Sequence, residues 1–115
     1  MNDLMRPCLY DAKHTIIPVT KPKLGAELVK FDAVGPVCET GDTFATEIEF
    51  PETAAGDLFA ILSAGAYGAV MSSSYNSRPL IPEVIVKDDK FSIIRKQITP
   101  EILLEYENLP SWTVK

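Results

Sequence analysis

Apolar residues recur at the two-residue spacing of β-strands in several short runs of the chain. In residues 26–34, Val29, Phe31 and Ala33 alternate with Leu28 and charged residues, and residues 43–50 alternate in the same way. Residues 57–63 form a nearly continuous apolar run, which is typical of a buried strand. The pattern predicts strands at residues 14–19, 26–34, 43–50, 57–63, 83–87 and 91–96.

Turn-forming residues separate these runs, and two segments have helical character. Asp88-Asp89-Lys90 lies between the last two runs and indicates a hairpin. Residues 66–73 could form one or two helical turns, and Thr99-Pro100-Glu101 is a good helix start, with an end expected at Leu109-Pro110. We therefore predict a mainly β fold, an antiparallel sandwich or barrel-like domain with one or two short helices.

Length, charge and composition exclude several classes of protein. A length of 115 residues predicts one domain, and the net charge of −5 argues against a nucleic-acid partner. The sequence has no stretch of 18 apolar residues and no secretory signal, so we expect no membrane span and a cytoplasmic location. Two cysteines, no Cys-x-x-Cys and a single histidine predict no metal site, and we expect His14 to pack on the first strand.

Three groups of residues could carry chemistry. Cys38 and Glu39 lie on a loop, where a thiol can donate a proton and a carboxylate can bind an ammonium group. Tyr67 lies between glycines and could donate a hydrogen bond to a phosphate. Arg6 and Tyr10 are four residues apart and could both bind a carboxylate, although the proline at position 7 argues against a continuous helix there. From the residues alone, the pattern favours structural readings: a partly buried Cys38 beside a solvated Glu39, and a Tyr67 that packs against its neighbours.

Four motifs, in order, resemble one family. Residues 1–12 are similar to the junction after the catalytic barrel of diaminopimelate decarboxylases, and residues 34–42 to their Gly-Pro-x-Cys-Glu-(Ser/Thr)-x-Asp motif. Residues 63–68 and 71–79 match two further motifs of the family. The resemblance implies that residues 1–115 are the C-terminal β-domain of such a decarboxylase, without its N-terminal α/β barrel.

The resemblance also implies an activity. The full enzymes use pyridoxal 5′-phosphate to convert meso-diaminopimelate to L-lysine and carbon dioxide in lysine biosynthesis. They work as homodimers whose active sites are built across the interface, and the lysine that forms the Schiff base lies in the barrel. The expected partners of this domain are therefore the barrel, a second subunit and the small-molecule substrate.

Each candidate residue then receives an expected role. Arg6 and Tyr10 would bind the distal carboxylate of the substrate. Cys38 would enter the partner subunit's site as the catalytic proton donor, and Glu39, also offered across the interface, would bind the distal ammonium. Tyr67 would contact the cofactor phosphate or the substrate beside it. A Glu after the cysteine suits diaminopimelate better than ornithine, because related ornithine decarboxylases typically have Asp there.

The missing barrel leads to two further expectations. A barrel needs about 250 residues, so we expect the 115-residue chain to be inactive alone. An excised fragment, a cloned domain and a truncated gene would all produce this sequence, and any of them leaves exposed edges that favour self-association. The alternatives are a catalytically dead binding or regulatory module that docks on a full enzyme, and a domain of an ornithine or carboxynorspermidine decarboxylase.

Overall fold

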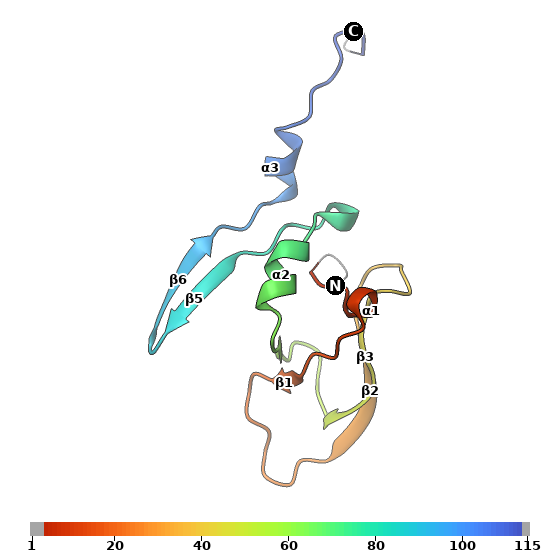
Figure 1. The fold of residues 1–115 in the computed structure, drawn as a ribbon, viewed down its shortest axis with the longest axis vertical. Coiled ribbons are helices and arrows are strands. Elements are labelled where there is room, and N and C mark those ends of the chain that lie inside the picture. The colour runs from red at the N-terminus through yellow and green to blue at the C-terminus, as the bar shows by residue number, and fades with distance from the viewer. Residues whose placement is uncertain (1–3, 114–115) are drawn as a thin grey trace.

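A computed structural model describes residues 4–113 (Figure 1). The first three residues of the junction motif, Met1, Asn2 and Asp3, lie outside the described range. In chain order the elements are α1 (Pro7–Tyr10), β1 (Ile16–Pro18), β2 (Leu28–Val34), β3 (Thr43–Pro51), β4 (Phe59–Ile61), α2 (Gly65–Met71), the 3-10 turn η1 (Tyr75–Ser77), β5 (Glu83–Lys87), β6 (Lys90–Arg95) and α3 (Pro100–Leu104).

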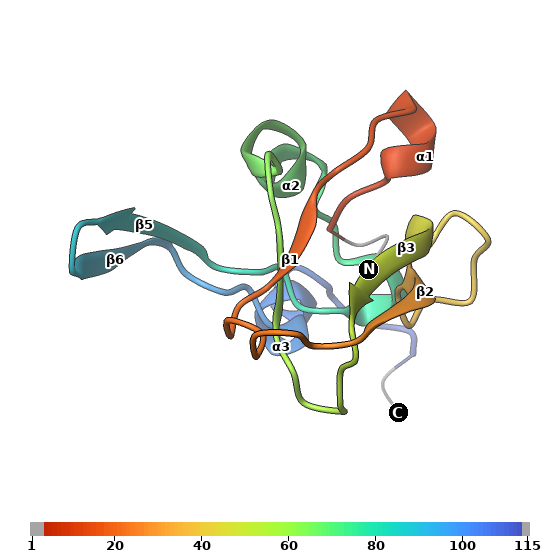
Figure 2. The same ribbon diagram turned by 90° about the horizontal axis from the view of Figure 1, so that it is seen from below.

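The predicted mainly β fold with antiparallel pairing and short helices is confirmed. Strands β2 and β3 form the longest ladder, β1 pairs with β4, and β5 pairs with β6 in the hairpin that the sequence indicated. Each of these pairs is a separate two-stranded sheet in the described part of the chain. Figure 2 shows β1 crossing the middle of the molecule, between the β2–β3 ladder and the β5–β6 hairpin.

Several elements differ from the predicted ranges. The helix that starts after Thr99 ends at Leu104 rather than near Leu109, and the exposed Tyr106 side chain finds no apolar surface that would extend it. The first strand begins only at Ile16, so the prediction that His14 packs on a strand is wrong. A single helical turn begins at Pro7, a position where proline is favoured because its missing N–H has no helical acceptor to lose.

The hydrophobic core is small and lies around the β2–β3 ladder. Among the described residues, the buried apolar side chains are Met5, Val37, Phe44 and Phe50. The Phe31 and Phe59 rings extend this core, with centroids 5.3 and 5.1 Å from that of Phe50. The radius of gyration is 17.9 Å, whereas a compact domain of this length has about 13 Å, so much of the chain lies away from the core.

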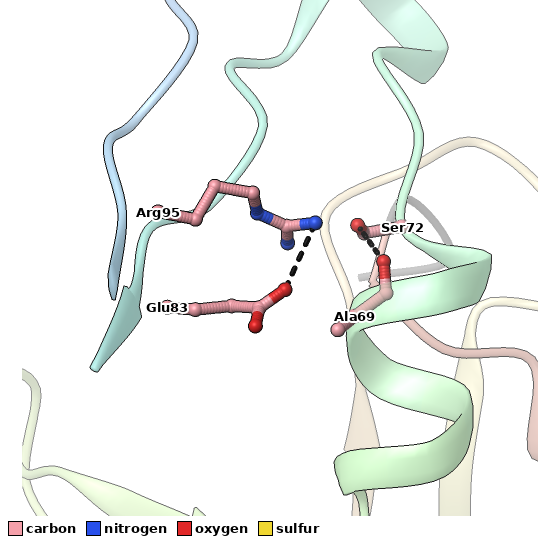
Figure 3. A network of polar contacts seen from close by, with 4 residues as sticks. All are labelled: Ala69, Ser72, Glu83 and Arg95. Atoms are coloured by element: carbon pink, nitrogen blue, oxygen red, sulfur yellow. Dashed lines mark hydrogen bonds and ion pairs between the residues drawn. The ribbon is translucent and has the colours of Figure 1, made fainter. Parts of the chain in front are cut away.

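The β5–β6 hairpin projects from the rest of the molecule (Figure 1). Val84 is paired with Ile93 and Val86 with Phe91, which places four large apolar side chains on one face, all exposed. At the base of the hairpin the Arg95 guanidinium pairs with Glu83 at 2.9 Å. Figure 3 shows this ion pair together with the hydrogen bond that the Ser72 hydroxyl donates to a carbonyl at the end of α2.

Across residues 4–113, no helix has both the length and the apolar character required to cross a bilayer.

Candidate functional site

Cys38 and Glu39 lie on a tight turn between β2 and β3. The Glu39 N–H donates to the Val37 carbonyl at 2.8 Å, which makes Cys38 the central residue of a γ-turn. The Asp42 N–H donates to the Glu39 carbonyl at 3.0 Å and closes a β-turn directly afterwards. Two consecutive turns direct this segment outward, and both the Cys38 thiol and the Glu39 side chain are exposed.

Asp42 holds this double turn closed from the inside. Its side chain is buried, with 3% of its surface exposed, and its Oδ2 accepts the Val37 N–H at 2.8 Å. Its backbone carbonyl accepts the Gly35 N–H at 2.8 Å. A buried carboxylate needs such hydrogen bonds, and these fix the backbone on both sides of Cys38. The shape of the turn is therefore set by residues within it.

Gly41 provides room for the Glu39 carboxylate. A Cβ at position 41 would lie 3.1 Å from Glu39 Oε1 and 3.5 Å from the Cys8 sulfur. The Cys8 thiol also donates to the Gly41 carbonyl, with Sγ and O 3.5 Å apart, so α1 touches the turn at this point. The Glu39 carboxylate and the Cys8 thiol therefore share the space above a residue that has no side chain.

The first helical turn, α1, also carries Tyr10, which meets Tyr67 of α2. Their rings stack with centroids 4.5 Å apart and an angle of 16° between the planes. Arg6, just before α1, places its guanidinium carbon 5.9 Å from the centroid of the Tyr75 ring, a cation–π contact. The structure thus brings Arg6, Tyr10 and Tyr67 close to η1. The rings of Tyr67 and of Tyr75, in η1, are both about half exposed.

Hydrogen bonds hold the Tyr10 hydroxyl. The Tyr10 oxygen lies 2.9 Å from Nε2 of His14, and Nδ1 of His14 lies 3.1 Å from the Leu62 carbonyl oxygen. The pKa of Tyr10 is raised above its ordinary value, first by burial and then by the nearby Tyr67 and Cys8, which would also be negative when ionised. Tyr10 is therefore a neutral phenol over a wide pH range.

Met5 connects the segment before α1 with α2. Its side chain is buried, and its sulfur would lie 3.8 Å from a Cβ added at Gly68. Gly68 is itself buried, one residue after Tyr67, so the absence of a side chain lets the two segments approach closely. This contact places Tyr67 against Tyr10.

The structure places the predicted site residues in two neighbouring groups. Arg6, Tyr10 and Tyr67 form one group, and Cys38 with Glu39 forms the other, on a turn that touches α1 through Cys8. Sequence reasoning missed the supporting roles of Cys8, Gly41 and Asp42. An Asp that follows a glycine in a loop often bonds to the turn backbone, so Asp42 could have been found, whereas the contact between Cys8 and Gly41 left no local signal.

The arrangement offers an exposed thiol, carboxylate and phenol, at Cys38, Glu39 and Tyr67, together with the half-buried guanidinium of Arg6 and phenol of Tyr10. These groups can donate protons and bind anions or ammonium groups. Within the described residues, no cluster of three or more His, Cys, Asp or Glu side chains could hold a metal ion. Cys38 and Glu39 are exposed, so a closed pocket around this pair requires further polypeptide.

The fold and this site define a class, a small antiparallel β-domain that presents a thiol and a carboxylate on an exposed turn. A family model for the C-terminal sheet domain of pyridoxal-dependent decarboxylases matches residues 1–94, and the chain belongs to this family. The resemblance expected from the motifs is therefore confirmed. The family model describes a C-terminal domain, so the full-length relatives carry a further N-terminal part.

Three similar proteins bear the name diaminopimelate decarboxylase. The diaminopimelate decarboxylase of Zymomonas mobilis is 52% identical over 112 residues, which cover 97% of this chain and 26% of that protein. The structure of diaminopimelate decarboxylase from Helicobacter pylori complexed with L-lysine superposes with a TM-score of 0.79 at 46% identity, over 91% of this chain and 25% of that one. The structure from M. jannaschii in co-complex with L-lysine gives 0.85 at 33% identity, over 96% and 25%. The chain thus spans about a quarter of the length of these relatives.

Proposed function

We propose that this chain is the C-terminal domain of a diaminopimelate decarboxylase, a cytoplasmic enzyme that converts meso-diaminopimelate to L-lysine and carbon dioxide. The observation that carries the proposal is the exposed Cys38–Glu39 pair on a turn whose shape Asp42 fixes from within. A thiol that can donate a proton and a carboxylate that can bind an ammonium group, both exposed in this way, are suited to a site that another polypeptide completes. The relatives that share this domain bear that enzyme's name, and two of their structures hold L-lysine, the proposed product.

Each side chain has a role that its chemistry allows. Arg6 can form a bidentate pair with the distal carboxylate of the substrate, and the Tyr10 hydroxyl can turn from His14 to donate a hydrogen bond beside it. Glu39, offered across the subunit interface together with Cys38, binds the distal ammonium of a substrate in the partner's site. A substrate carboxylate or ammonium without a partner in a closed site would be costly, so recognition of both groups separates diaminopimelate from amines that lack the carboxylate.

Cys38 supplies the proton. In the proposed reaction the substrate carbon that has lost carbon dioxide must gain a proton, and the exposed thiol of Cys38 can deliver it across the subunit interface. The neighbouring Glu39 carboxylate, with its substrate ammonium, fixes the distance of that carbon from the thiol.

The residues present fit pyridoxal phosphate at one point, its phosphate group. Tyr67 is 47% exposed and lies in the first turn of α2, where its hydroxyl can donate one hydrogen bond to a phosphate oxygen. Pyridoxal phosphate, when bound, supplies the electron sink for decarboxylation. The lysine that attaches it belongs to the proposed N-terminal barrel. This chain alone is therefore expected to be inactive, with a second subunit of the complete enzyme as partner.

The test is decarboxylation by the complete protein that contains this domain. Purified with pyridoxal phosphate, it should release carbon dioxide from meso-diaminopimelate in preference to ornithine and carboxynorspermidine, and the isolated 115-residue chain should release none. A preference for either of the other two amino acids would replace the proposed substrate. Turnover by the isolated chain would overturn the assignment of the chemistry to a missing barrel.

A further inference from the structure

The contact between Arg6 and Tyr75 holds a guanidinium without using its hydrogen-bond donors. The central carbon of the guanidinium lies over the Tyr75 ring, 5.9 Å from the ring centroid. The attraction acts between the positive charge and the negative face of the ring, so it requires no particular N–H group. Within residues 4–113, Arg6 forms no ion pair with a carboxylate. The planar fork of N–H donors can therefore bind a carboxylate while the ring holds the charged group.

Tyr75 belongs to a turn with an unusual backbone. The two residues after it, Asn76 and Ser77, both have a φ of 56°, in the left-handed region. The Arg78 N–H closes the turn by donating to the Tyr75 carbonyl at 3.3 Å. Two consecutive left-handed residues that carry side chains are costly, and such conformations persist where the surrounding structure requires them, often at ligand sites. The turn therefore gives Tyr75 a defined position beside Arg6.

Two tyrosines meet the two candidate ligands of the distal carboxylate. Tyr67, in α2, stacks on Tyr10, and Tyr75, in η1, meets Arg6. Arg6 precedes a helix of four residues that has no side-chain cap, so its own segment gives the long side chain little support. An arginine side chain has many rotamers, and ordering it when a ligand binds costs part of the affinity. A ring that already holds the guanidinium reduces this cost.

We propose that Tyr75 is a positioning residue for substrate recognition: the face of its ring holds the Arg6 guanidinium where the distal carboxylate binds. The inference rests on the proposed function, because the carboxylate is that of diaminopimelate. A side-chain carboxylate in place of the ring would also attract the guanidinium, but it would occupy the N–H fork and compete with the substrate. The ring avoids this competition. Tyr75 acts through Arg6 and not on the reacting carbon.

The experiment compares three substitutions in the complete enzyme. Tyr75→Leu removes the ring face but keeps an apolar side chain, and it should raise KM for diaminopimelate roughly three- to tenfold with kcat within about twofold. Tyr75→Phe keeps the ring face and should leave KM within about twofold of the unmodified enzyme. Tyr106→Leu makes the same change at an exposed tyrosine that follows α3, and as the control it should leave both constants unchanged. An unchanged KM for Tyr75→Leu, or an equal rise for Tyr75→Phe, would overturn the inference.

A double-mutant cycle with Arg6 separates positioning from a general effect on the domain. If Tyr75 acts through the guanidinium, Tyr75→Leu should cause no further loss of kcat/KM in an Arg6→Gln background. An undiminished loss in that background would overturn the inference. Failure of the Tyr75→Leu enzyme to fold would do the same, because it would assign the residue to stability. Failure of the unmodified enzyme to decarboxylate diaminopimelate would instead overturn the proposed function, so the two failures are distinguishable.

Discussion

The Asp42 carboxylate and the Val37 N–H are joined by a 2.8 Å hydrogen bond inside the turn that presents Cys38. Asp42 is buried, so its removal leaves the Val37 N–H without this acceptor in a place that water reaches poorly. The bond therefore affects both the stability of the domain and the placement of the two exposed side chains between its ends.

Asp42→Ala should lower the free energy of unfolding by about 1–3 kcal/mol and should reduce kcat of the complete enzyme. Thermal unfolding and steady-state kinetics are the measurements. Asp42→Asn is the matched variant, because its amide oxygen can still accept the Val37 N–H, and it should retain more stability than the alanine variant. Equal stability of the alanine variant and the unmodified protein would show that the bond does not hold the turn.

Gly41→Ala should raise KM for diaminopimelate by roughly two- to tenfold while leaving the fold intact. The added Cβ would lie 3.1 Å from Glu39 Oε1, so the carboxylate must move by a few tenths of an ångström. Gly65→Ala is the control for stability, since a Cβ there meets no atom of the described residues within 4 Å. An unchanged KM would mean that the carboxylate position does not matter for substrate binding.

Cys38→Ala should lower kcat of the complete enzyme about a hundredfold, which is within the usual contribution of a general acid, with little change in KM. Cys8→Ala removes the other exposed thiol and should change kcat far less. The comparison is made by steady-state kinetics with diaminopimelate. A larger loss for Cys8→Ala than for Cys38→Ala would transfer the role of proton donor to the thiol on α1.

The isolated chain should self-associate through the exposed apolar face of the β5–β6 hairpin. Val86 and Phe91 are 69% and 75% exposed and lie opposite each other on that face. Val86→Lys or Phe91→Lys should shift the chain toward monomer in sedimentation velocity, whereas Asp89→Asn at the hairpin tip, with the same change in net charge, should not. Association that is equally strong in all three variants would place the contact elsewhere.

Tyr10 should ionise at higher pH than an ordinary tyrosine, because burial, then Tyr67 and Cys8, raise its pKa. The raised pKa means that its contribution to stability is complete below the ordinary value of about 10 and is lost as the pH rises through the folded-state value. Absorbance titration of the phenolates, compared with a Tyr10→Phe variant, measures this. The difference between the two titration curves is the ionisation of Tyr10. If this difference appeared at the ordinary pKa of tyrosine, the predicted rise in the pKa of Tyr10 would be wrong.

Local patterns predicted the strands well where pairing is local. The β5–β6 hairpin follows from two apolar runs around Asp88-Asp89-Lys90, and the β2–β3 ladder from two alternating runs. The β1–β4 pair is shorter than its apolar runs, because only three residues of each strand find partners. The sequence pattern does not reveal that one apolar face of the hairpin is exposed. An alternating apolar run looks the same whether or not another segment covers that face.

Part of the candidate site could also be predicted. The Cys38–Glu39 loop and the small-residue setting of Tyr67 are visible in the sequence, because turns and glycines are local features. The stack of Tyr10 on Tyr67 and the link from His14 to Leu62 join distant segments, and no spacing rule reveals such contacts. His14 was therefore assigned to packing although its two ring nitrogens are both engaged.

The double turn around Cys38 is closed by its own backbone and by Asp42, before any second polypeptide is present. In the proposed dimer, assembly would therefore lose little conformational entropy at this segment, and the thiol would meet a partner's pocket already in shape. The exposed apolar face of the hairpin lies on a different element from this turn, so subunit affinity and proton delivery would then depend on different residues.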